Sequence, residues 1–63
     1  MFEEYASVQA TKDLSDNVIA GCIGVIVFIY NDPRLAYEVE FFDDKNNTID
    51  VLTVEPDDIE LKS

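Results

Sequence analysis

The pattern of hydrophobic and polar positions predicts short strands rather than helices. The clearest alternation lies in residues 36–42, with the sequence AYEVEFF. Successive side chains of a strand point to opposite faces, so every second residue shares a face. One face holds Tyr37, Val39 and Phe41, and the other holds Glu38, Glu40 and Phe42. This pattern is typical of a half-buried strand with an acidic outer face.

The uncharged stretch at residues 18–30 predicts a second strand. It is too short for a transmembrane helix, which needs about 20 residues. Residues 25–30 are all β-branched or aromatic, which favours a strand buried on both faces. Gly21 and Gly24 would weaken a helix and are expected at turn or bulge positions. A phosphate-binding loop is excluded because two glycines are too few and no Lys-Ser or Lys-Thr follows them.

The remaining segments predict three further strands. Residues 5–11 read as the first strand, followed by a polar loop at 12–17, and residues 31–34 form a turn of type I. A polar turn at 43–47 precedes a strand at 48–54, in which Ile49 and Val51 are expected to face inward and Asp50 outward. The pattern shifts at Leu52, which indicates a bulge or a strand shared between two sheets. Residues 55–58 suit one helical turn, and 59–62 suit a last short strand.

Five short strands joined mostly by tight turns predict an all-β fold. A chain of this kind can close into a small five-stranded barrel, which removes most exposed strand edges. The sequence has no internal repeat, linker or low-complexity run, so we expect residues 1–63 to form a single domain.

The charge balance narrows the possible partners. Fourteen acidic residues against four basic ones give a formal net charge of −10. Such a charge opposes binding to nucleic acid or to an anionic membrane, and favours either a basic protein partner or simple solubility. The single cysteine excludes an internal disulfide and suits a cytoplasmic protein. Glu3 and Glu4 occupy the place where a signal peptide would need positive charge. We expect a monomer or a weak dimer when no partner is bound.

The order of motifs resembles a family of very short bacterial proteins that is known only as a domain of unknown function. The resemblance rests on VQATKDL at 8–14, AGCIGVIVFIY at 20–30, AYEVEFFDDKNNTI at 36–49 and PDDIEL at 56–61. It implies an SH3-like β-barrel and a small partner-binding protein, with some members acting as antitoxins or immunity proteins. It supplies no catalytic residue.

Three groups of residues have the composition of a chemical site but lack a feature that such a site requires. Asp44, Asn46, Thr48, Asp50 and Glu55 fit the spacing of a calcium-binding loop, but Ile49 stands where that loop requires glycine. Adjacent acidic pairs have no histidine or nucleophile beside them, which argues against general acid–base catalysis. Cys22 has no neighbouring positive charge to activate its thiol. We therefore expect no enzyme activity, no metal and no cofactor.

The acidic surface is the one feature that points to a function. The expected partner-binding residues are Glu38, Glu40, Phe42, Asp43, Asp44, Asp50 and Tyr37. The leading hypothesis is a non-enzymatic binding module, an immunity protein or antitoxin that occludes the basic cleft of a toxin, most specifically a nuclease. The alternatives are an acidic face that serves only solubility, and an accessory SH3-like subunit of a larger enzyme complex.

Overall fold

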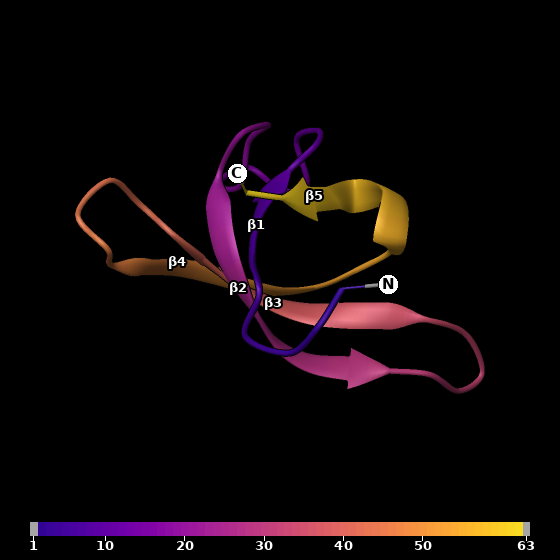
Figure 1. Ribbon diagram of the computed structural model, residues 1–63. Helices are drawn as coiled ribbons and strands as arrows, with labels where there is room; N and C mark the ends of the chain where they lie inside the picture. Colours follow the sequence, from indigo (N-terminus) through magenta and orange to yellow (C-terminus); the bar gives the residue numbers. More distant parts are fainter. Residues whose placement is uncertain (1, 63) are drawn as a thin grey trace.

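The computed structural model describes residues 2–62 as one curled antiparallel sheet (Figure 1). Its strands are β1 (Ser7–Ala10), β2 (Ile23–Tyr30), β3 (Ala36–Phe42), β4 (Thr48–Val54) and β5 (Ile59–Leu61). Their order across the sheet is β4-β3-β2-β1-β5. A single 3-10 turn, η1 (Pro56–Asp58), joins β4 to β5. The predicted all-β, five-stranded, SH3-like barrel is confirmed.

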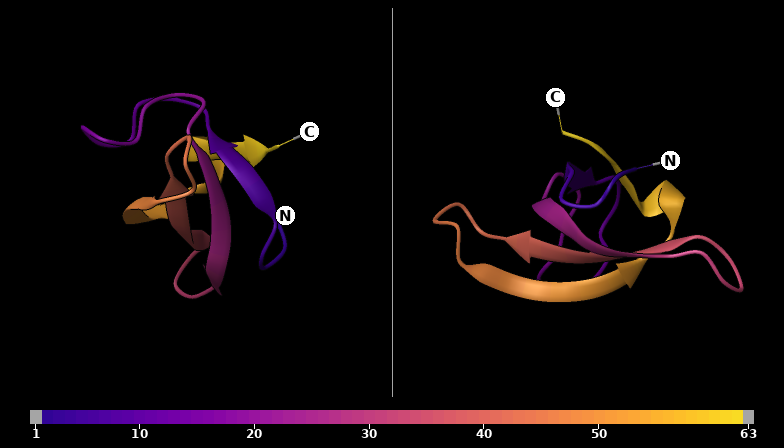
Figure 2. Two further views of the ribbon diagram at one scale, coloured as in Figure 1. Left: turned by 90° about the vertical axis from the view of Figure 1, so that its left-hand side faces the viewer. Right: turned by 60° about the horizontal axis from the view of Figure 1, so that its bottom comes forward.

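The sheet curls so that its two ends lie over one face of its middle. The right-hand view of Figure 2 shows β3 and β4 side by side below, with β1 and β5 folded above them. The turn η1 makes this return possible, because it reverses the chain within a few residues after β4. Two hydrogen bonds fix it: the Glu55 N–H donates to the Asp58 carboxylate, and the Asp58 N–H donates to the Glu55 backbone carbonyl, each at 2.9 Å.

The core lies inside this curl and is built from nine buried apolar residues. They are Val8, Ala10, Val18, Ile26, Tyr37, Val39, Phe41, Val54 and Ile59. Strand β3 supplies three of them in alternation, as predicted from its sequence. Tyr37 is 0% exposed, its ring packs edge-on against Phe2, and its hydroxyl accepts a hydrogen bond from the Phe2 backbone N–H. The expectation that Tyr37 serves as a surface anchor is therefore wrong.

Strand β2 differs from its prediction in two respects. Gly24 lies inside the strand, opposite Phe41, and not in a turn or bulge. Gly21 does occupy a turn, with φ of +88°, a conformation that favours glycine. The second half of the strand is also not buried on both faces, since Phe28 is 50% exposed. The register with β3 shifts between Ile26 and Phe28, so Val27 is an extra residue and Phe28 lies opposite Glu38, on the side away from the core.

A bulge between β3 and β4 reverses the predicted orientation of part of β4. The register places Phe41 opposite Asp50 but Phe42 opposite Thr48, so Ile49 is the extra residue. Asp50 consequently lies on the core side of the sheet, and Val51 faces outward. The prediction that Val51 faces inward and Asp50 faces outward is wrong.

Candidate partner-binding surface

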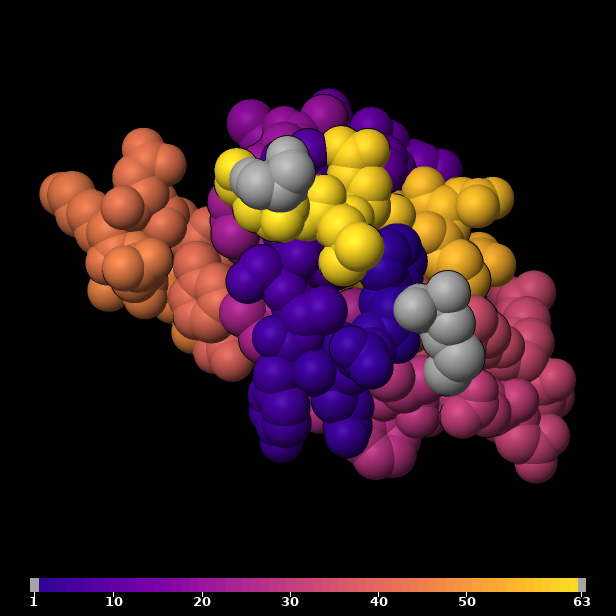
Figure 3. Space-filling model, viewed as in Figure 1, coloured from indigo at the N-terminus to yellow at the C-terminus, as the bar shows by residue number. Residues whose placement is uncertain are grey.

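The side of the sheet that faces away from the core presents a mixed acidic and apolar surface, here called the outer face. Cross-strand pairing defines it: Val25 lies opposite Glu40, Phe28 opposite Glu38, and Phe42 opposite Thr48. Its members are Ile23, Val25, Phe28, Tyr30, Ala36, Glu38, Glu40, Phe42, Thr48, Val51 and Thr53. Every one of them is exposed or half-buried. The opposite side is covered, as Figure 3 shows for the N-terminal segment and β5.

Two carboxylates at the centre of the outer face are held by threonine hydroxyls of the neighbouring strand. The Thr53 hydroxyl donates to Glu38, and the Thr48 hydroxyl donates to Glu40. The ion pairs among residues 2–62, Lys12–Asp58 and Arg34–Glu55, involve neither glutamate. Both carboxylates are therefore oriented by hydrogen bonds while their charge is not neutralised by a cation.

An aromatic pair lies beside these carboxylates. Phe28 is 50% exposed and Tyr30 is 38% exposed, and their ring centroids are 4.9 Å apart in an edge-on arrangement. Phe28 is directly opposite Glu38 in the sheet. Phe28 was not among the predicted surface residues, because its strand was expected to be buried on both faces. The spacing of the two aromatics, two residues apart in a strand, was the available signal that they share a face.

The predicted binding residues separate into three groups in the structure. Glu38, Glu40 and Phe42 lie together on the outer face. Asp50 does not join them, because its carboxylate accepts hydrogen bonds from the Val51 N–H at 3.0 Å and, on the core side, from the Ser15 hydroxyl at 3.4 Å. The expectation that Asp50 shares their orientation is wrong. Asp43 and Asp44 lie at the β3–β4 turn, and Tyr37 is in the core.

The two aspartates at the β3–β4 turn have different roles. Asp43 Oδ1 accepts hydrogen bonds from the backbone N–H groups of Lys45 and Asn47, each at 2.9 Å. The bond from Asn47 is the main reason that the pKa of Asp43 lies below its usual value. Asp43 thus fixes the turn. Asp44 accepts no hydrogen bond within the described chain and remains available to a partner.

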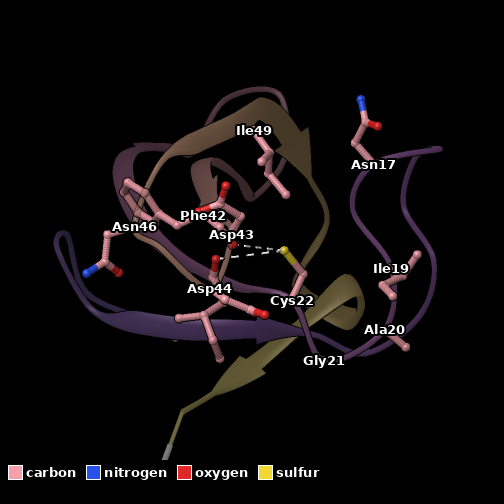
Figure 4. A pocket seen from close by; sticks show the side chains of 11 residues that line it. Asn17, Ile19, Ala20, Gly21, Cys22, Phe42, Asp43, Asp44, Asn46 and Ile49 are labelled. Atoms are coloured by element: carbon pink, nitrogen blue, oxygen red, sulfur yellow. Dashed lines mark hydrogen bonds between the residues drawn. The ribbon is translucent and has the colours of Figure 1, made fainter.

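A groove opens between this turn and the loop that leads into β2, and we call it the hairpin groove. Residues 17 and 19–23 line one side, and residues 42–44, 46 and 49 line the other (Figure 4). The Cys22 thiol points into it and donates to the Phe42 carbonyl at 3.5 Å. Burial raises the pKa of the Cys22 thiol, and the Asp44 carboxylate adds to this effect. A raised pKa keeps the thiol protonated at neutral pH, which is unfavourable for a nucleophile.

No metal site accompanies the acidic residues in the part of the chain that the structure describes. Residues 2–62 contain no group of three or more His, Cys, Asp or Glu side chains arranged to hold a metal ion. Within the same range, no helix is long and apolar enough to cross a bilayer.

The fold and the outer face define a small all-β protein that presents fixed carboxylates beside exposed aromatic rings. The chain belongs to the family described as "Domain of unknown function (DUF4926)", whose profile matches residues 4–61. The match spans nearly the whole domain. The chain matches no curated protein and no solved structure.

Proposed function

We propose that this protein is a non-enzymatic binding module whose outer face docks onto a basic protein. The observation that carries the proposal is the placement of Phe28, paired with Tyr30, directly opposite Glu38, on the same face as the oriented carboxylate of Glu40. Exposed aromatics next to complementary charge are the composition of interface hot spots.

The two parts of the outer face would act at different stages of binding. Unpaired carboxylates on a body of net charge −10 steer a cationic partner and raise the association rate. Aromatic side chains that become buried in the interface slow dissociation instead. Thr48 and Thr53 support the first effect, because they hold the carboxylates in place before the partner arrives.

The most specific form of the proposal is an immunity protein or antitoxin that occludes the basic cleft of a toxin. Nuclease toxins bind phosphate through basic surfaces, which an acidic face can cover. The motif resemblance described above supports this form. The alternative, an accessory subunit of a larger complex, would use the same outer face on a partner that is not inhibited.

The test begins with affinity capture from the native host and identification of the bound protein by mass spectrometry. Association and dissociation rates are then measured with the purified partner. We expect Glu38→Lys/Glu40→Lys to reduce the association rate about tenfold or more at low salt, and to weaken its dependence on salt. The charge-matched control is Glu3→Lys/Glu4→Lys, which should have a clearly smaller effect because both residues lie outside the outer face.

Two outcomes separate the forms of the proposal. Phe28→Ala should raise the dissociation rate, with a hot-spot cost of about 2 kcal/mol. If both double variants behave alike and Phe28→Ala changes nothing while all remain folded, the outer face serves only solubility. If the outer face binds but the partner has no nuclease activity that this protein blocks, the accessory-subunit alternative replaces the immunity role.

A further inference from the structure

We infer that the hairpin groove is a second docking site, which takes one apolar side chain flanked by lysine or arginine from an extended segment of another protein. The groove lies at the opposite end of β3 from the Phe28–Tyr30 pair and shares Ile23 and Phe42 with the outer face. The inference does not rest on the proposed role of the outer face. It comes from the chemistry of the groove's walls and rim.

The walls include four large apolar side chains among polar ones, and no part of the described chain covers the groove. Ile19 is 59% exposed, and Ile23, Phe42 and Ile49 are half-buried around it. Figure 4 shows Ile19 on the loop side, with Phe42 and Ile49 across the groove. These side chains come from three separate segments, so together they form a concave apolar surface and not a single projecting residue.

The size and shape of the hairpin groove favour a side chain of a protein segment. Its volume of about 560 Å³ lies within the range of sites that hold organic ligands. It is open along one side, between a loop and a hairpin turn, and does not enclose its contents. An extended segment can lay one side chain into such a groove while its backbone remains outside.

The charge at the rim of the hairpin groove determines which residues can flank the bound apolar side chain. The lining includes two carboxylates, those of Asp43 and Asp44, and no lysine or arginine. Asp43 is occupied by the turn, whereas the Asp44 carboxylate is exposed and accepts no hydrogen bond from residues 2–62. A segment with acidic residues beside its apolar side chain would be repelled, and one with basic residues would be attracted.

The test uses three acetylated and amidated peptides and a protein labelled with ¹⁵N for NMR titration. The peptides are Lys-Lys-Leu-Lys-Lys, Lys-Lys-Gly-Lys-Lys and Glu-Glu-Leu-Glu-Glu. We expect the leucine–lysine peptide to bind about fivefold or more tightly than the glycine peptide, because burying the leucine side chain adds apolar contact. Its largest amide shifts should fall in residues 19–23 and 42–49, and the acidic peptide should not bind.

Two variants with matched exposure give the control. Ile19→Ser removes an exposed apolar side chain inside the groove, and Leu61→Ser removes one of nearly equal exposure, 61%, outside it. The advantage of the leucine–lysine peptide over the glycine peptide should disappear in Ile19→Ser and persist in Leu61→Ser. As a measurement on the unaltered protein, the leucine–lysine peptide should slow the reaction of Cys22, the single cysteine, with a maleimide, and the glycine peptide should not.

Three results would overturn the inference. One is equal affinity of the leucine–lysine and glycine peptides, which would mean that only charge attracts them. Another is a shift map centred on Phe28 and Tyr30 of the outer face. The third is an unchanged rate of Cys22 modification when the leucine–lysine peptide is bound.

Discussion

Gly24→Ala is expected to destabilise the protein because the core leaves no room for a methyl group at this position. A Cβ atom on Gly24 would lie 2.7 Å from Val39 Cγ1, 2.8 Å from Phe41 Cδ1 and 3.0 Å from the Glu40 carbonyl oxygen. Carbon atoms in favourable contact are about 3.5–4.0 Å apart, so the overlap approaches 1 Å. Val39 and Phe41 are both 0% exposed and cannot move into solvent.

The expected magnitude follows from two opposing effects. Overpacking of a core costs about 1–3 kcal/mol, and replacing glycine with alanine recovers about 0.4–1 kcal/mol by restricting the unfolded chain. The overlap with two immobile side chains places the cost in the upper part of this range, at about 2–3 kcal/mol, so the net loss is about 1–2.5 kcal/mol. In a domain of this size, such a loss lowers the Tm by about 5–20 °C. Urea denaturation followed by circular dichroism would measure it, with an unchanged dependence on urea concentration.

Gly21 supplies the control, because its constraint is conformational and not steric. Its φ is +88° and no atom lies within 4 Å of a Cβ built there. Asparagine tolerates this conformation better than alanine, so Gly21→Asn should be more stable than Gly21→Ala. At Gly24 the order should reverse, because asparagine is larger. The packing argument would be refuted if Gly24→Ala were as stable as the parent. It would also be refuted if the alanine and asparagine variants ranked in the same order of stability at Gly21 and at Gly24.

Two further predictions concern the aspartates of the β3–β4 region. The pKa of Asp43 in the folded protein is lowered, chiefly by the hydrogen bond from the Asn47 N–H. The Asp43 carboxylate therefore stabilises the fold at a pH above its unfolded pKa of about 3.9, and this stabilisation is lost as the pH falls through the folded-state pKa. Asp43→Ala should therefore lower the Tm at pH 7, with a difference from the parent that shrinks in acid, and Asp44→Ala should change little at either pH. Asp50 accepts the Val51 N–H on the edge strand β4, so Asp50→Ala should promote strand-to-strand self-association in sedimentation measurements at high salt. The charge-matched Asp44→Ala should remain as monomeric as the parent, and a monomeric Asp50→Ala would contradict this role.

Local patterns in the sequence were sufficient to identify the strands and the face of β3. The alternation from Ala36 to Phe42 depends only on the pleat of the backbone, so it correctly placed Val39 and Phe41 inside and Glu38 and Glu40 outside. The turn at Gly21 and the helical turn after Glu55 were also predictable, because both follow from the conformations available to glycine and proline.

The composition of the outer face was decided by the tertiary structure. Phe28 is exposed because one extra residue, Val27, enters the ladder between β2 and β3 and turns Phe28 to the side of Glu38, away from the core. Val51 faces outward and Asp50 faces the core side because one extra residue, Ile49, enters the ladder opposite β3. A strand's alternation specifies two faces, but pairing and bulges determine which face is covered, and those depend on contacts between residues far apart in the chain.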